Sequence, residues 1–555
     1  MGRNELRISK DSHHFNSSAL PKIDARSCQS LRFPCSQLFH NRPSTPVDCK
    51  LFLSQSLFSL SIMPNKYEGL LDQVQLDDIK LEPVSWRPVR ASRKTFDLVR
   101  PEFWSLRPGN PKPRKPTRPT AWLDGLRGFA ALMVYFHHHQ LWSHGFNGNF
   151  VFENSFGYQG KHYFAALPFV RPFFSGGHFA VAIFFVISGY VLSVKSLGQI
   201  QKGQFSNASE TIGSALFRRW LRLFLPVIAT TFIWFSQRHW FGIWVELGDL
   251  KSTYREEVWT WYSTFKNYSF VFLTGNMYEF PMIYHAHLWS IPVEFKGSII
   301  IYTALSAFSR CTRNARLWCE VVLMFYFLYI VDGWYGALFM SGMFLCDLEL
   351  LVIDDQLPPI FTALGGFKEL IFFHLFIAAV YLGGVPSCDV NGNESDLAKS
   401  PGWKFLYHFK PQAVFDAKWF YLSWAAFLLV ASIPRLLLVK RFFETRVCQY
   451  LARISFAFYL VHGPVMWLFA DRVYAAVGFD RPLHKEHIPK WVNAFPISKK
   501  GPVGLELAFW APQLIILPLT LYVAEMVTKL IDEPSVRFSN WLYRKSLAPQ
   551  ASPKL

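Results

Sequence analysis

Apolar residues along this chain fall into runs long enough to cross a lipid bilayer. A membrane-spanning helix needs about 20 predominantly apolar residues, and such runs recur from residue 123 onward, separated by polar loops. The pattern predicts an all-α, polytopic membrane helical bundle of about ten transmembrane helices. The expected spans are residues 123–142, 179–194, 216–235, 288–308, 317–331, 335–352, 370–385, 420–439, 454–469 and 507–531.

The composition agrees with a surface that is covered largely by lipid. Of the 555 residues, 51% are hydrophobic and only 17% are charged, whereas soluble domains average about 25% charged residues. The formal net charge of +18 would suggest a nucleic-acid partner in a soluble protein. Here, however, Lys and Arg gather in the tails and in alternate loops, as expected of membrane proteins. We therefore expect a lipid bilayer and no nucleic acid as partner.

The placement of Lys and Arg also predicts the orientation of the spans. The loops after the second, fourth and eighth spans and the C-terminal tail are basic, which indicates a cytosolic location. This favours a multi-pass protein of the endomembrane or plasma membrane with both termini cytosolic. The loop at 480–500 departs from this pattern, because it carries several lysines on the outer side. Glycosylation sequons begin at Asn267 and Asn393 in outer loops and at Asn207 in an inner loop.

Residues 1–118 are expected to form a basic, Pro-rich, disordered cytosolic region. Residues 87–118 alone contain ten Lys or Arg, six Pro and two acids, a composition typical of disorder. A more protein-like acidic segment begins at Met63, so residues 1–62 are a candidate gene-model extension, with Met63 as the alternative start. The membrane domain is expected at 119–542, followed by a short cytosolic tail at 543–555.

The first span carries an unusual set of ionisable residues: Asp124, Arg127, His137, His138 and His139. Such side chains are costly inside a membrane, so each is a functional candidate. Arg127 and His138 are eleven residues apart, which is nearly three turns and roughly 16 Å along one helix face. We expect both to line one internal cavity, with Arg127 near the cytosolic end and His138 deeper.

This pair suits transfer from a phosphorylated carrier to a hydroxyl group. Arginine binds phosphate with a planar fork, and histidine can take a proton from a hydroxyl near neutral pH. Structural explanations compete with this hypothesis, since Arg127 could snorkel to the membrane edge and the histidines could lie at the interface. Adjacent histidines point about 100° apart, so the triplet predicts no metal site.

Other polar positions in the spans leave alternatives open. Arg218, Arg219 and Arg222 could grip phosphates or serve as an ordinary positive-inside anchor. Glu294 needs a partner in its span, which could be an arginine, His138 or both. Ser188-Gly189 is interpreted as a close helix contact rather than a nucleophile turn. His285 and His287 are expected at the membrane interface.

Several segments, in order, resemble the acyltransferase-3 family of integral membrane O-acyltransferases. LDGLRGFAALMVYFHHH at 123–139 is similar to its opening motif of an arginine, ten residues and a histidine, and this spacing selects His138 among the three histidines. The other similar segments are FFVISGYVLS at 184–193, FRRWLRLFLP at 217–226, HLWSIPVEF at 287–295, FMSGMFLCD at 339–347, ISFAFYLVHGP at 454–464 and DEP at 532–534. Ala182 and Pro292 depart from the family pattern.

The resemblance implies a ten-helix enzyme that passes an acyl group, usually acetyl from acetyl-CoA, to a hydroxyl of a glycan, lipid or secondary metabolite. It assigns function to Arg127 and His138. We therefore expect Arg127, with Arg218, Arg219 or Arg222, to hold acyl-CoA as co-substrate, with no bound cofactor or metal. His138 would act as the general base and Glu294 would support it.

The sequence also allows other interpretations of the mechanism and of the protein class. The histidine could instead carry the acyl group in two steps. A multi-pass transporter would also need buried charges and many helices, although the sequence lacks a clear inverted repeat of broken helices. A membrane protein that keeps the fold without catalysis is a third alternative.

Overall fold

The computed structural model describes residues 120–144, 154–272, 279–359, 363, 365–387 and 394–548. Across these ranges the chain forms helices joined by turns and loops, and no β-strand is found in them. The all-α class predicted from sequence is therefore confirmed. The expected N-terminal region at 1–118, the alternative start at Met63 and the last residues of the expected C-terminal tail lie outside the described residues.

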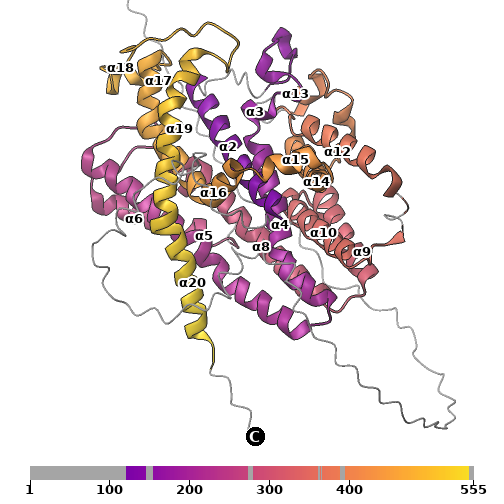
Figure 1. Cartoon of the computed structure of the whole chain (residues 1–555). Coiled ribbons are helices and arrows are strands. Elements are labelled where there is room, and N and C mark those ends of the chain that lie inside the picture. The colour runs from indigo at the N-terminus through magenta and orange to yellow at the C-terminus, as the bar shows by residue number, and fades with distance from the viewer. Residues whose placement is uncertain are drawn as a thin grey trace, which may run out of the picture. The chain divides into compact units, whose positions relative to one another are not determined.

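Every predicted span overlaps a helix, and the span at 420–439 covers parts of two helices. The helices are α2 (Ala121–His144), α3 (Pro172–Ser175), α4 (Gly177–Gln201), α5 (Phe205–Phe241), α6 (Tyr254–Ser269), α7 (Glu279–Tyr284), α8 (Ser290–Phe308), α9 (Arg313–Phe325), α10 (Trp334–Ile353), α12 (Lys368–Leu382), α13 (Glu394–Lys399), α14 (Ala417–Ser432), α15 (Leu437–Phe443), α16 (Arg446–Val465), α17 (Asp471–Val477), α18 (Pro482–His487), α19 (Leu507–Val527) and α20 (Glu533–Ser546). Figure 1 shows α2 near α4 and α16, with α12 on one side and α19 on the other.

Seven helical segments of the described chain are long and apolar enough to cross a membrane. These correspond to seven of the predicted spans. The helices α2, α5 and α9 are not among these seven segments. Helix α2 contains Asp124, Arg127 and four histidines, which lower its mean hydropathy. The count of ten spans therefore stays a prediction, whereas the class of helical membrane protein is supported directly.

Two helices at the sides of the bundle expose apolar stripes. On α12, Leu370, Phe373 and Ile377 are exposed, and on α19, Leu507 and Leu514 are exposed. Each stripe follows the three-to-four-residue repeat of one helix face. Because a bilayer covers such apolar surface, these faces are the ones we assign to lipid.

Glycines allow α4 and α10 to pack backbone against backbone. A Cβ added at Gly189 would lie 2.0 Å from the carbonyl oxygen of Phe339, and one at Gly342 would lie 2.0 Å from that of Val186. Any larger residue would separate the helices. Gly189 is therefore a helix-packing contact, as its sequence context predicts.

A second pair of glycines brings α2 against α16. A Cβ at Gly128 would lie 2.4 Å from the backbone nitrogen of Ala452, and one at Gly125 would collide with the carbonyl of Phe443, just before α16. The two helices run parallel, because early residues of α2 meet early residues of α16 and late residues meet late ones. The face of α2 that carries Arg127 and His138 is thus held against α16.

Candidate active site

Three histidines from separate parts of the chain meet on the inner face of α2. His138 comes from α2, His287 from the 3₁₀ turn Ala286–Trp289 before α8, and His462 from α16. The Nδ1 of His138 lies 3.0 Å from the Nε2 of His462. His287 is stacked on both rings, with centroids 3.6 Å from His138 and 4.6 Å from His462. His287 and His462 are buried, whereas His138 remains partly exposed.

The ring geometry suits stacking better than metal coordination. The nitrogens of the three histidines approach one another within 4.8 Å, a spacing that raises the question of a shared ion. The ring of His287, however, is inclined by only 14° to His138 and 11° to His462. A zinc ion bound through ring nitrogens lies about 2 Å away and close to each ring plane. Stacked parallel rings cannot meet that condition together, so coordination would require one of them to turn.

The neighbouring histidines of α2 point elsewhere. His137 packs against Gly177 and the ring of His178, at the start of α4. The Nδ1 of His139 lies 2.8 Å from the hydroxyl of Tyr474. The three adjacent side chains therefore diverge around the helix, as their spacing predicts, and His138 alone joins the cluster.

A proline in α16 explains how the 3₁₀ turn reaches this cluster. Pro464 lies inside α16 and has no N–H, so the carbonyl of Leu460 one turn earlier loses its helical donor. The Nε2 of His285 lies 2.9 Å from that carbonyl and donates a hydrogen bond to it. Gly463 leaves room for the His285 ring, since an added Cβ would lie 2.9 Å from its Cε1. The contact fixes the backbone two residues before His287.

Arg127 lies near the opposite end of α2 on the same α16-facing side. Its guanidinium donates a hydrogen bond of 3.1 Å to the carbonyl of Ala452 and lies 3.3 Å from a carboxylate oxygen of Asp124. The half-buried carboxylate of Asp532 lies close enough to Arg222 and Arg127 to attract both guanidinium groups. Arg127 and Arg222 thus lie in one charged region at this end of the bundle.

The other arginines of the predicted set have structural partners. Arg218 donates to the side-chain oxygen of Asn540 in α20, at 2.8 Å. Arg219 forms an ion pair with Glu294 and donates to the hydroxyl of Ser298. Among the described residues, Glu294 is paired with Arg219 and makes no contact with His138. The structure therefore favours the arginine as partner of Glu294.

Ionic contacts hold the end of α2 beyond His138. Trp142 donates a hydrogen bond of 2.8 Å to Asp471, which is also paired with Arg481. His144 lies 3.3 Å from Glu506, just before α19. Burial alone would raise the pKa of Glu506, but hydrogen bonds from His144 and the backbone lower that pKa below its ordinary value. These contacts restrict rotation of the helix that carries His138.

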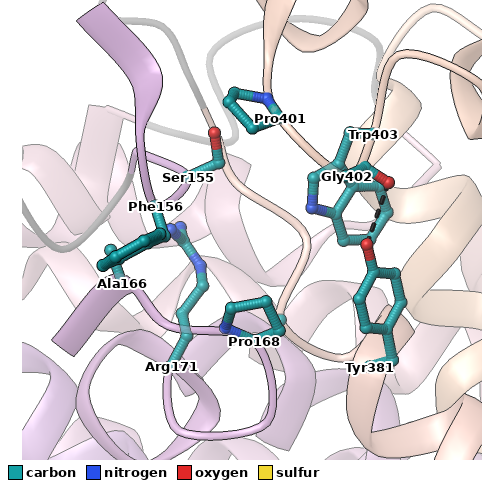
Figure 2. Close-up of a pocket in the computed structure, with 10 residues that line it drawn as sticks. Ser155, Phe156, Ala166, Pro168, Arg171, Tyr381, Pro401, Gly402 and Trp403 are labelled. Atoms are coloured by element: carbon teal, nitrogen blue, oxygen red, sulfur yellow. Dashed lines mark hydrogen bonds between the residues drawn. The ribbon is translucent and has the colours of Figure 1, made fainter. Parts of the chain in front are cut away.

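A separate cavity of about 170 Å³ lies between the loop that precedes α3 and the loops around α12 and α13. Figure 2 shows its lining, with the hydroxyl of Tyr381 bonded to the carbonyl of Gly402 beside Trp403 and with Arg171 on another side. Trp403 stacks on Tyr381 at a centroid distance of 5.4 Å. None of the residues predicted from sequence for the active site lines this cavity.

Sequence reasoning missed the parts of the cluster that α2 does not supply. His287 was expected at the membrane interface together with His285, but both are buried in the bundle, at 8% and 2% exposure. His462 appears in the sequence only as part of a family-like segment. In each case the sequence held a signal for a functional residue, namely a histidine within an apolar run, at 285–291 and at 457–463.

Comparison with known proteins identifies the class. The family model described as acyltransferase domain, of the acyltransferase-3 family, matches residues 120–524. The chain belongs to the acyltransferase-3 family. It is therefore an enzyme, an acyltransferase that transfers groups other than aminoacyl groups, and its helices place it in a membrane.

Individual relatives agree with this class. An O-acetyltransferase of Phomopsis amygdali, PaAT-1, is 28% identical over 504 residues, covering 84% of this chain and 92% of that protein. Acyltransferase R4 of a Phoma species is 22% identical, covering 69% and 84% of the two chains. Acyltransferase clz18 of Cochliobolus lunatus is 21% identical, covering 68% and 83%. No solved structure matches the chain significantly.

Proposed function

We propose that this acyltransferase moves an acyl group, in particular acetyl, from acyl-CoA to a hydroxyl of a glycan, lipid or secondary metabolite. The observation that carries the proposal is the α2–α16 pair, which presents Arg127 and His138 on one face at opposite ends. The printed name of the Phomopsis amygdali relative supports O-acetyl transfer in particular.

The donor would bind at the arginine end of this face. The nucleotide part of acyl-CoA carries phosphates, which arginine binds through charge-assisted hydrogen bonds. Arg127 and Arg222 are the members of the predicted set that we place there, because both lie near Asp532 at this end of the bundle. The pantetheine arm would then extend along α2 toward His138.

His138 would act as the general base in a direct transfer. The acceptor oxygen bonds to the thioester carbonyl carbon while its proton passes to His138. The carbon–sulfur bond then breaks, and the departing CoA thiolate takes up that proton. A positioned base of this kind contributes about two to four orders of magnitude in rate. In the alternative two-step route His138 carries the acyl group itself, and trapping a labelled acyl-enzyme after quenching would support that route.

The test is a thioester assay on the purified protein in lipid nanodiscs. We expect labelled acetyl-CoA to release CoA thiol and to pass its label to a hydroxyl-bearing acceptor from a membrane or metabolite extract. Longer acyl-CoA donors, run in parallel, define the acyl preference. Folded protein that consumes no acyl-CoA of any length, with any acceptor fraction, would contradict the proposal.

A further inference from the structure

The hydrogen bonds around His462 determine which nitrogen of His138 is available for chemistry. The Nδ1 of His462 lies 2.7 Å from the backbone carbonyl of Tyr459. A carbonyl oxygen only accepts, so this Nδ1 must carry a proton. His462 makes its other contact through Nε2, which lies 3.0 Å from the Nδ1 of His138. The two nitrogens share one proton in this hydrogen bond.

These two contacts leave Nε2 as the nitrogen at which His138 gains and loses a proton. In the neutral cluster, Nε2 of His462 is the acceptor and Nδ1 of His138 is the donor, so Nε2 of His138 carries the lone pair. That nitrogen has no hydrogen-bond partner among the described residues, and its side chain is partly exposed. The lone pair is therefore directed away from His462.

His462 does for His138 what a carboxylate does for the histidine of a serine hydrolase. In that arrangement a third group bonds the far ring nitrogen, fixes the tautomer and supports the imidazolium that forms. Here the third group is a neutral imidazole, which costs less to bury in a membrane bundle than an unpaired carboxylate. Glu294 does not fill this role, since it is paired with Arg219.

We infer that His462 is the positioning residue of the acyl transfer: it accepts a hydrogen bond from Nδ1 of His138 and thereby directs Nε2 of His138 to the acceptor hydroxyl. The inference rests on the proposed function, in which His138 is the base. Stacking of His287 on both rings holds them in parallel planes and keeps the contact aligned.

Two substitutions at His462 separate an acceptor role from simple packing. His462→Leu fills similar space without an acceptor, whereas His462→Gln can place an amide oxygen near the position of Nε2. We expect His462→Leu to lower kcat about 100-fold with little change in the KM for acetyl-CoA, because the arginine end is untouched. His462→Gln should recover at least about a tenth of the wild-type kcat. Added imidazole should restore part of the activity of His462→Ala.

His374→Leu is the matched control, since His374 lies exposed on α12 and bonds only the carbonyl of Leu370 one turn earlier. Folding of each variant is checked by its unfolding temperature and elution profile. Wild-type kcat in His462→Leu would overturn the inference while leaving the role of His138 intact. Equal loss in folded His462→Leu and His462→Gln, without imidazole rescue, would overturn it as well. Full activity of His138→Ala would instead overturn the proposed function.

Discussion

At the scale of single residues, the structure divides the polar side chains of the spans into two kinds. Within the described part of the chain, one ring nitrogen of His138 has no hydrogen-bond partner, whereas Glu294 is paired with Arg219, which also donates to Ser298. A general base needs a lone pair that no protein group occupies, whereas the two members of a structural ion pair are bound to each other. This difference supports our proposal that His138 transfers the proton, and it favours a structural role for Glu294.

Breaking the Arg219–Glu294 pair tests that division. Either Arg219→Leu or Glu294→Leu leaves a largely buried charge without its partner, which typically costs about 3–5 kcal/mol of stability. We expect each single variant to unfold at a clearly lower temperature in detergent and the double variant to recover much of the loss. A double variant as unstable as the sum of both single variants would show that the pair is not the relevant contact.

The part of the site that sequence could predict is the part that one helix contains. Arg127 and His138 lie on α2, so helical periodicity alone placed them on one face. His287 and His462 lie more than 140 residues further along the chain, and only the packing of α16 and the turn before α8 brings them to His138. Their contribution depends on tertiary contacts, which helical periodicity does not encode.

At the scale of helices, the close approach of α2 and α16 is what aligns the site. Gly125 and Gly128 remove the side chains that would separate the two helices. Helix positions were predictable because apolar runs of about 20 residues have few alternatives in a membrane. Helix ends were less predictable. Helix α5 spans Phe205–Phe241 and so extends beyond the apolar run at 216–235, because its polar ends are also helical.

Replacing Gly128 by alanine should therefore harm both stability and catalysis. The new Cβ would lie 2.4 Å from the backbone of α16, and overpacking of this kind costs about 1–3 kcal/mol. Separation of the helices should also lower kcat several-fold by displacing His138 from His462. The matched control is Gly213→Ala in α5, where nothing lies within 4 Å of an added Cβ; it should be neutral or slightly stabilising. Equal behaviour of both variants would contradict this account.

At the scale of the whole molecule, the binding site for acyl-CoA and the site of acyl transfer have to be located relative to the membrane. We propose from the positive-inside pattern that both termini and the arginine end of α2 face the cytosol, where acyl-CoA is found. His138 then lies deeper, on the path toward the outer face. The orientation is a proposal drawn from charge distribution, and the exposed stripes of α12 and α19 mark the surfaces that lipid covers.

Glycosylation reports on this orientation. Asn267, on α6, and Asn393, which lies outside the described residues, should be on the outer side, and Asn207 at the start of α5 should be cytosolic. In a eukaryotic expression host we expect Asn267→Gln with Asn393→Gln to remove any glycosidase-sensitive shift in mobility. Asn207→Gln, the matched control, should leave it unchanged. Loss of the shift only in Asn207→Gln would show the inverted topology.

The central claim, that His138 is the base of an acyl transfer, is tested most directly by the turnover of His138→Ala in nanodiscs. His374→Ala, on the lipid-facing surface of α12, serves as the control for substitution of a membrane histidine. The account predicts that His138→Ala loses about two to four orders of magnitude in kcat while its unfolding temperature and acetyl-CoA binding stay close to wild type. Wild-type turnover in folded His138→Ala would contradict it.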